Sequence, residues 1–216
     1  MKAVTLHLSR AYSVTKAGLA LVGLAALLGF SALPFEPEDA VLEVPVPVAT
    51  RPIDEGISMA QEREQQALAE FISRRWRIAE TAALSFVTTA YHAGKVHSVD
   101  PVLILAVMAI ESRYNPVAES TMGAKGLMQV IPRFHLEKLL DHGGEEALLN
   151  PEVNIHVGAQ ILREYTRRLG DLELALQMYG GAFDDPTAQY AAKVFGERAR
   201  LEPVREAARK QTATSA

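Results

Sequence analysis

The stretch DPVLILAVMAIESRYNPVAESTMGAKGLMQ, residues 100–129, decides how this chain folds. Asp100 is a typical helix N-cap, and proline, here Pro101, is favoured at the first helical position. A helix is therefore predicted over Val102–Ser112. The turn Tyr114-Asn115-Pro116 ends that helix. One stripe of it is expected in the core and consists of Leu103, Ala106, Val107 and Ile110.

A carboxyl group stands near the end of this apolar helix. Glu111 follows Ile104, Val107 and Met108 at helical spacing, so its own face of the helix is apolar. Burial and the negative end of the helix dipole both disfavour the ionised form, so we expect a raised pKa for Glu111. A general acid that works near neutral pH needs such a pKa. The alternative is a glutamate that reaches solvent at a helix end.

A loop of small residues follows the helix. Within Ser120–Gln129 the glycines Gly123 and Gly126 lie three positions apart. Glycines at this spacing indicate a backbone that closely approaches a ligand or another helix. A phosphate-binding loop would need a preceding strand and a lysine–hydroxyl pair, and the sequence offers neither.

These residues resemble the core motifs of the lytic transglycosylases with the soluble-transglycosylase (SLT) catalytic domain. The matching residues are Glu111-Ser112, Asn115-Pro116, Ala118, Ser120, Gly123-Ala124, Gly126-Leu127-Met128-Gln129, Pro132, Asn150-Pro151, Asn154-Ile155, Gly158-Ala159 and Leu162. The resemblance covers about residues 90–200.

This resemblance implies a lysozyme-like, mainly helical fold with a groove for a glycan strand, in a catalytic domain over residues 91–203. Its catalytic glutamate matches Glu111. The residues that it implies for substrate binding are Ser120, Gly126, Met128, Gln129 and Tyr179. It implies no metal and no other cofactor. For Tyr179 the alternative is a buried tyrosine with a structural hydrogen bond.

Two positions depart from the family pattern. Gly180 stands where the family usually has an asparagine after the tyrosine, so that residue's polar contact near the reacting sugar would be missing. The pair Phe134-His135 replaces the usual Thr-Ala pair after Pro132. We expect His135 to be a partly exposed helix histidine.

The implied substrate is peptidoglycan, cleaved without water. Glu111 would protonate the oxygen of the β-1,4 bond between N-acetylmuramic acid and N-acetylglucosamine. It would then take the proton of the C6 hydroxyl, which closes onto C1 to give a 1,6-anhydro end. Most glycosidases use two carboxylates, whereas the next acid, Glu119, is expected to face solvent. Two alternatives stay open: a hydrolytic muramidase similar to goose-type lysozymes, and a weakly active peptidoglycan-binding scaffold of an envelope-spanning machine.

Helical patterns continue on both sides of the central stretch. Residues 58–90 are predicted to form accessory helices that complete or flank the catalytic domain. Asn150-Pro151 and Asp185-Pro186 predict helices over Val153–Leu169 and Thr187–Arg200, and residues 204–216 are expected to be a frayed tail. Because no alternating strand pattern exceeds a few residues, the class is all-α, with about seven helices.

The N-terminal residues predict export. An uncharged run of 17 residues, 17–33, follows Arg10 and Lys16 and precedes acidic residues, the asymmetry that keeps an N-terminus cytoplasmic. Residues 1–35 are therefore a signal-anchor in the inner membrane or a cleaved signal peptide, and the following domain is periplasmic. A buried helix of the folded domain is a third reading. The Pro-rich, acidic residues 36–57 are a semi-rigid linker.

Composition excludes several classes of protein. The chain has no cysteine, so disulfides, thiolate metal sites and a cysteine nucleophile are excluded. Its net charge is −4 and no basic stripe contains interleaved aromatic residues, so no nucleic-acid partner is expected. The histidines include no pair at metal-ligand spacing on one helix, and no Gly-x-Ser-x-Gly motif predicts a serine nucleophile.

Overall fold

The computed structural model describes residues 59–214, with side chains up to residue 210. They belong to one compact unit, Pro52–Ala216. The predicted anchor at residues 17–33 and the linker at 36–57 lie outside the described residues. No helix in the described part combines the length and the apolar character that a membrane crossing requires.

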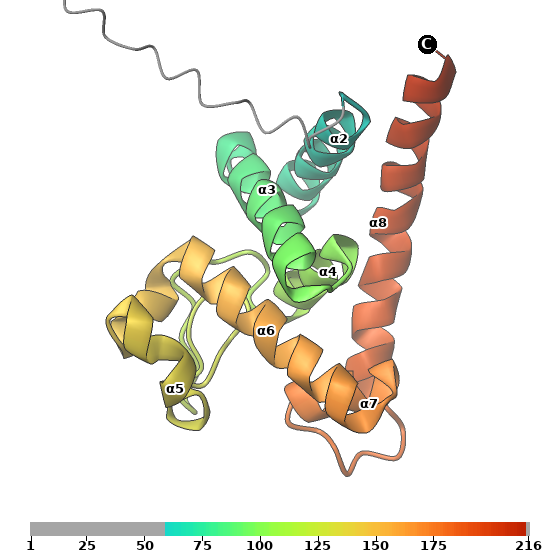
Figure 1. The fold of residues 1–216 in the computed structure, drawn as a ribbon. Coiled ribbons are helices and arrows are strands. Elements are labelled where there is room, and N and C mark those ends of the chain that lie inside the picture. Colours follow the sequence, from blue (N-terminus) through green and yellow to red (C-terminus); the bar gives the residue numbers. More distant parts are fainter. Residues whose placement is uncertain (1–58, 215–216) are drawn as a thin grey trace, which may run out of the picture. The chain divides into compact units, whose positions relative to one another are not determined.

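Residues 59–214 are mainly helical, as predicted, and within them the only extended pairing is two isolated β-bridges. The α-helices, shown in Figure 1, are α2 (Met59–Trp76), α3 (Glu80–His97), α4 (Pro101–Glu111), α5 (Leu136–Leu139), α6 (Pro151–Leu169), α7 (Leu172–Tyr179) and α8 (Gln189–Thr214). Three 3-10 helices connect them: η2 (Pro132–Phe134), η3 (Leu140–His142) and η4 (Glu145–Leu149).

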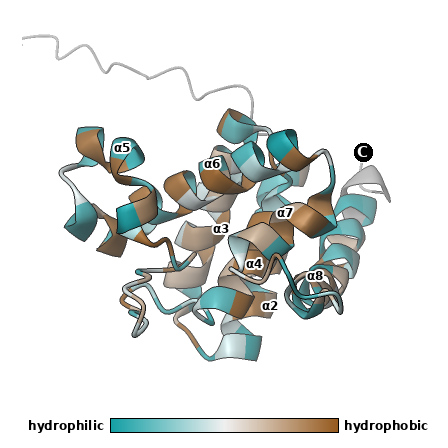
Figure 2. Ribbon diagram, turned by 90° about the horizontal axis from the view of Figure 1, so that it is seen from below, coloured by the Kyte–Doolittle hydropathy of each residue, from teal (hydrophilic) through white to brown (hydrophobic). Residues whose placement is uncertain are grey.

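Helix α4 is the centre of the core. Asp100 caps it as predicted, since its carboxylate accepts a hydrogen bond of 3.0 Å from the Val102 amide. Every residue from Val102 to Ala109 is buried, and α4 packs against α3 and α8. Figure 2 shows this helix in hydrophobic colours in the middle of the domain. A helix that is apolar on all sides is stable only where other helices surround it, so α4 fixes the position of its last residue, Glu111.

The helices before α4 belong to the same core. Leu68 and Ile72 of α2 are completely buried, and α3 runs without a break across the predicted domain boundary at residues 90 and 91. Residues 58–90 were expected as accessory helices, and the helices are present. They are part of the same packed unit as α4 rather than a separate layer.

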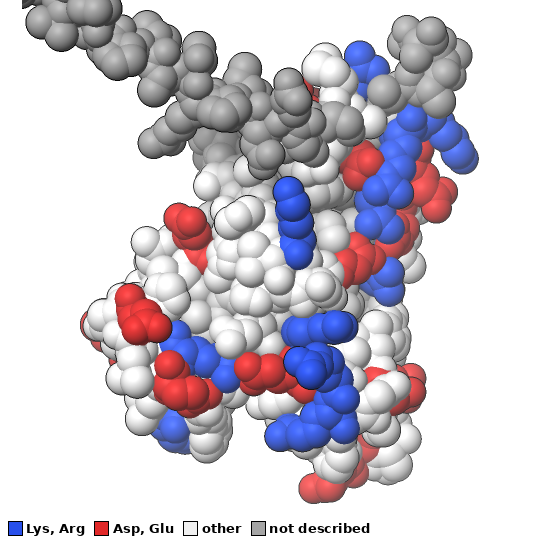
Figure 3. Space-filling model, viewed as in Figure 1, with Lys and Arg blue, Asp and Glu red and all other residues white. Residues whose placement is uncertain are grey.

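The predicted frayed tail is wrong for residues 204–214, because α8 continues as a helix to Thr214. Arg205 pairs with Asp100 at 3.0 Å, and the Arg209 guanidinium pairs with the carboxylate of Glu64. Ala208 is also buried. In a sequence, charged residues without an apolar pattern indicate a tail. Here the partners of Arg205 and Arg209 lie 105 and 145 positions earlier in the chain. Figure 3 shows acidic and basic side chains side by side along α8.

The start of α8 also differs from the expectation. The Asp185-Pro186 pair predicted a helix from Thr187, whereas α8 begins at Gln189. The Asp185 carboxylate accepts hydrogen bonds from the Thr187 and Gln189 amides, and so it closes a turn before the helix instead of capping it.

Three histidines form a hydrogen-bonded chain between α3 and α6. His92 Nδ1 lies 3.1 Å from His156 Nε2, and His156 Nδ1 lies 3.3 Å from His97 Nε2. Neutral imidazoles satisfy both contacts, because each ring offers one donor and one acceptor. Burial, followed by the neighbouring histidines, lowers the pKa of His156, and burial lowers that of His97 despite the opposing effect of Glu164.

We expect this chain to make the fold sensitive to acid. Because the two pKa values are lowered in the folded state, the unfolded chain binds more protons below about pH 6.5. The stabilisation is therefore complete above that pH and is lost as the pH falls through it. The melting temperature of the wild type should drop more steeply from pH 7 to 5 than that of His156→Gln. An equal slope in His156→Gln would contradict the prediction.

Candidate active site

Glu111 is held at the end of α4 by its neighbour. The Ser112 hydroxyl donates a hydrogen bond of 2.7 Å to the Leu127 carbonyl in the glycine-containing loop. The Glu-Ser pair of the sequence thus has a local physical reason: the serine fixes the loop against the helix end that carries the carboxyl group. Tyr114, which is buried, donates to the Leu105 carbonyl and secures the turn after the helix.

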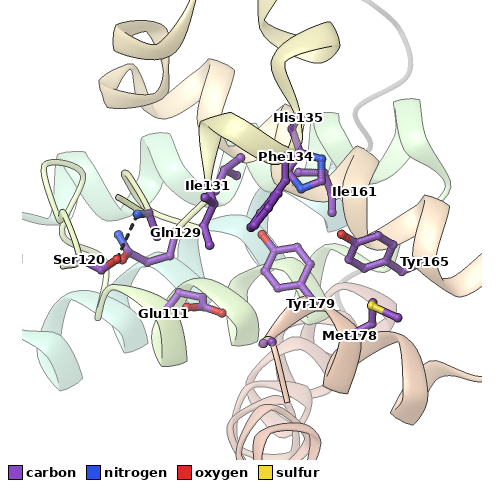
Figure 4. Close-up of a pocket in the computed structure, with 14 residues that line it drawn as sticks. Glu111, Ser120, Gln129, Ile131, Phe134, His135, Ile161, Tyr165, Met178 and Tyr179 are labelled. Carbon is purple, nitrogen blue, oxygen red and sulfur yellow. Dashed lines mark hydrogen bonds between the residues drawn. The ribbon is translucent and has the colours of Figure 1, made fainter. Parts of the chain in front are cut away.

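A pocket of about 300 Å³ opens beside Glu111. Its lining comes from α4, the glycine-containing loop, η2, α6 and α7, and comprises Glu111, Ser120, Ala124, Gln129, Val130, Ile131, Phe134, His135, Ile161, Tyr165, Met178, Tyr179, Gly180 and Gly181. Figure 4 shows Glu111, Ser120 and Gln129 on one side, Tyr165 and Met178 on the other, and Tyr179 between them. Among the described residues that line this pocket, Glu111 alone carries a carboxyl group.

The environment of Glu111 favours its protonated form. Burial raises the pKa of Glu111 to about 7, although a hydrogen bond from Tyr190 opposes the rise. The raised pKa predicted from the sequence is therefore confirmed, and burial is its main cause. With a pKa near 7, the group can donate a proton and accept one again at neutral pH, as a single acid/base catalyst must.

Tyr190 is the partner of Glu111 that the sequence analysis missed. Its hydroxyl donates a hydrogen bond of 2.5 Å to Glu111 Oε1. Burial raises the pKa of Tyr190, so the hydroxyl keeps its proton. The two residues are 79 positions apart, and the tyrosine lies near the start of α8. No local pattern marks it, because only the packing of α8 against α4 brings the two side chains together.

Removal of the Tyr190 hydroxyl should change the pH profile of any activity that depends on Glu111. The hydrogen bond stabilises the carboxylate, so Tyr190→Phe should raise the pKa of Glu111 further and move the alkaline limb of the rate profile to higher pH. Turnover at the optimum should fall roughly tenfold, because the carboxyl loses its orienting partner. Rates measured from pH 5 to 9 test this, and an unmoved alkaline limb would refute the assigned role.

Tyr179 lines the pocket, but its hydroxyl already has a protein partner. It donates a hydrogen bond of 2.9 Å to the Met128 carbonyl. The structural bond that the sequence analysis considered as an alternative is present. Tyr179 thus offers its ring to the pocket, while its hydroxyl joins α7 to the glycine-containing loop.

Ser120 and Gln129 lie on the same side of the pocket as Glu111. The Ser120 hydroxyl accepts a hydrogen bond of 3.0 Å from the Ala124 amide, marked in Figure 4. Gln129 donates from its side-chain amide to the Ala118 and Gly126 carbonyls, at 3.1 and 3.0 Å. Both side chains therefore shape the loop. These bonds do not use the Ser120 hydroxyl proton or the Gln129 side-chain oxygen, and both can face a ligand.

Gly126 and Met128 do not line the pocket, which corrects the expectation for these two residues. Met128 is completely buried, and a Cβ atom on Gly158 would lie 2.5 Å from its sulfur atom. A Cβ atom on Gly126 would lie 2.3 Å from the Asn154 amide nitrogen. These glycines therefore permit close packing between the loop and α6 rather than the approach of a ligand.

Asn154 joins the loop to α6. Completely buried, it accepts a hydrogen bond of 2.7 Å from the Met128 amide and donates to the Lys125 and Leu148 carbonyls at 2.8 and 2.9 Å. Because all three bonds are made in the core, the loop has one strongly preferred position under the pocket.

The two departures from the family pattern both lie at the pocket. The Tyr190 ring fills the space beside Gly180, since a Cβ atom there would lie 2.4 Å from Tyr190 Cγ. His135 lines the pocket between η2 and α5, so it is not the helix histidine that was expected, although it is partly exposed as expected. Burial lowers the pKa of His135, which keeps its imidazole neutral.

The described residues form a helical domain in which one carboxyl, oriented by a tyrosine, faces a pocket of ligand size. The transglycosylase SLT domain family matches residues 88–193, so this part of the chain is similar to that family.

Three curated relatives illustrate the match. The chain is 36% identical over 113 residues to a transglycosylase of Enterobacteria phage PRD1, which covers 52% of this chain and 40% of the phage protein. It is 40% identical over 86 residues to an endo-type membrane-bound lytic murein transglycosylase A of Klebsiella pneumoniae, covering 37% of this chain and 42% of that protein. It is 34% identical over 88 residues to a soluble lytic murein transglycosylase of Salmonella typhimurium, and this match covers 38% of this chain and 13% of that protein. The chain thus spans less than half the length of each of these relatives.

A solved structure is also similar. It is an inactive mutant of the lytic transglycosylase Slt from Pseudomonas aeruginosa, with a TM-score of 0.48 and 22% sequence identity, and the similarity covers 53% of this chain and 23% of that one.

Proposed function

We propose that this protein is a lytic transglycosylase that cleaves the glycan strands of peptidoglycan with Glu111 as its only acid/base catalyst. The observation that carries the proposal is the partly buried carboxyl with a pKa of about 7, held by Tyr190 beside a pocket that no other carboxyl lines among the described residues. The family match over residues 88–193 and the lytic murein transglycosylases among the relatives support it.

The proposed reaction needs one carboxyl because the substrate supplies the nucleophile. Protonated Glu111 gives its proton to the glycosidic oxygen between N-acetylmuramic acid and N-acetylglucosamine, and the bond from that oxygen to C1 breaks. The acetamido oxygen of the muramyl residue stabilises the positive C1. Ionised Glu111 then takes the proton of the C6 hydroxyl, whose oxygen bonds to C1. The product carries a 1,6-anhydro end, no water is consumed and Glu111 regains its proton.

The residues around Glu111 receive matching roles. Ser120 and Gln129 position the acetamido group of the muramyl residue, since their polar groups flank the same side of the pocket as the carboxyl. Tyr179 supports the sugar ring with its aromatic face. Tyr190 orients Glu111 and stabilises the carboxylate after the first proton transfer. The proposal gives the domain a lysozyme-like fold, which its helical architecture around the pocket supports.

The proposal places the domain in the periplasm, tethered to the inner membrane through residues 17–33. The Pro-rich linker at residues 36–57 would let the domain reach a cell wall that stands off from the membrane. Relatives named as membrane-bound lytic murein transglycosylases support an envelope location.

Digestion of purified sacculi tests the proposed reaction. We expect soluble muropeptides that are lighter by one water than the hydrolytic products, in mass spectra of the wild-type digest. Products with free reducing ends would instead identify a hydrolytic muramidase. If the wild type binds sacculi but releases nothing, the protein acts as a peptidoglycan-binding scaffold and the catalytic proposal fails.

A further inference from the structure

A row of aromatic rings leads from Tyr179, in the middle of the pocket, to the side opposite Glu111. The His135 and Tyr165 rings have centroids 6.5 Å apart, and those of Tyr165 and Tyr179 are also 6.5 Å apart. Phe134, which is 62% exposed, adds a fourth ring (Figure 4). Exposed rings of this kind suit the apolar face of a sugar, but rings alone do not select one sugar over another.

Two arginines lie against these rings. The Arg133 guanidinium carbon is 4.8 Å from the centroid of the Phe134 ring, and the Arg168 guanidinium carbon is 5.0 Å from that of Tyr165. A guanidinium over an aromatic face is held by cation–π attraction, which orders a side chain that would otherwise be free in solvent.

The position of Arg168 on α6 directs it to the pocket. Ile161, Tyr165 and Arg168 are spaced at i, i+4 and i+7, so they share one stripe of the helix. Ile161 and Tyr165 line the pocket, and Arg168 continues their stripe by one turn. By the same helical spacing, Arg163 and Arg167 fall on the other side of α6.

Neither rim arginine is neutralised within the described residues. Lys138, the nearest paired cation in sequence, contacts Glu137 and Glu164 at 2.8 and 3.0 Å, whereas Arg133 and Arg168 take part in no described ion pair. Glu111, the one carboxyl that lines the pocket within residues 59–214, lies on the opposite side, and its raised pKa favours the protonated form. The two guanidinium groups at the far rim are therefore positive charges that no described ion pair neutralises, since the nearby Glu137 and Glu164 pair with Lys138.

We propose that Arg133 and Arg168 bind a carboxylate carried by the muramyl residue of the glycan strand. This inference rests on the proposed function and specifies which part of the substrate meets this rim. A planar guanidinium binds a carboxylate through two parallel hydrogen bonds, and stacking on a ring leaves the edge of the guanidinium available for them. The carboxylate belongs either to the lactyl group itself or to the peptide attached to it, and both project from the same side of the sugar.

Binding to the Glu111→Gln protein tests this inference, because the glycan is not consumed. Isothermal titration would compare neutral N-acetylglucosamine oligomers, amidase-treated strands with a free lactyl carboxylate, and strands that keep their peptides. When Arg133→Gln and Arg168→Gln are introduced into the Glu111→Gln protein, its affinity for one or both acidic ligands should fall about tenfold at low salt. The loss should be smaller at high salt. Binding of the neutral oligomers should not change. Which acidic ligand responds identifies the source of the carboxylate.

The matched control adds Arg163→Gln and Arg167→Gln instead. These changes remove the same total charge, but from the other side of α6, so binding should be unaffected. Three results would overturn the inference and leave the proposed function in place. They are an equal loss of affinity in this control, an equal loss of affinity for the neutral oligomers, or no loss of affinity for any ligand. If the Glu111→Gln protein binds none of the three glycans, the proposed function fails as well.

Discussion

The Glu111→Gln protein should lose its activity on sacculi by about 10²- to 10⁴-fold, the usual contribution of a general acid/base. Gln can neither donate nor take the proton, and no other carboxyl among the described residues lines the pocket to replace it. The release of soluble muropeptides over time measures the effect. The control is Glu119→Gln, since the Glu119 carboxylate is exposed and contacts Lys125 at 3.7 Å outside the pocket. It should retain activity.

The same substitution should stabilise the fold at alkaline pH. Because burial raises the pKa of Glu111 to about 7 from an ordinary 4.5, the folded state binds more protons than the unfolded state between these values. The free energy of unfolding therefore falls as the pH rises from 4.5 to 7, by about 3 kcal/mol. Gln carries no charge and avoids this loss.

Thermal unfolding at two pH values measures the second effect. The Glu111→Gln protein should melt at a higher temperature than the wild type at pH 8 and at a similar temperature at pH 4. If the two proteins melt together at pH 8, Glu111 is not buried in the way the structure indicates. The proposal that it acts as a protonated acid would then lose its physical basis.

Gly180→Asn, which introduces the residue usual in the family, should damage this protein rather than improve it. A Cβ atom at Gly180 would lie 2.4 Å from Tyr190 Cγ, so the ring must move. Such overpacking costs about 1–3 kcal/mol. It also displaces the hydroxyl that orients Glu111, so turnover should fall at least about tenfold. The backbone itself is no obstacle, because Gly180 has φ −75° and ψ 4°, which asparagine readily adopts.

Thermal melts and sacculus digests test this prediction together. Gly196→Ala is the matched control, since nothing lies within 4 Å of a Cβ atom at this position in α8, and it should be neutral or slightly stabilising. A double-mutant cycle isolates the contact: Gly180→Ala should be less destabilising in a Tyr190→Ala background than in the wild type. Higher turnover of Gly180→Asn at an unchanged melting temperature would contradict the prediction.

Much of the site could be predicted because its chemistry is local in the chain. Asp100 and Pro101 begin α4, and an apolar run of one helix length places a carboxyl at its end. The raised pKa of Glu111 follows from that placement, since the neighbours at helical spacing are apolar and become buried. The all-helical class follows in the same way from capping pairs and periodicity.

Other features of the fold and the site could not be predicted, because they depend on contacts between residues that are distant in the sequence. Gly126 and Met128 were expected at the groove, yet Asn154 and Gly158 of α6 draw them into the core. The last turns of α8 were predicted to be a tail because their partners, the α4 cap Asp100 and Glu64 of α2, lie far away in the sequence.

The sequence by itself determined a helical domain with one acid at the end of a buried helix, because helix capping, periodicity and burial act over a few residues. Only the tertiary structure decided what faces that acid. Tyr190 reaches Glu111 across 79 positions, and the space beside Gly180 belongs to its ring. Such contacts arise from the packing of whole helices, and packing depends on shape and volume that no short stretch of sequence contains.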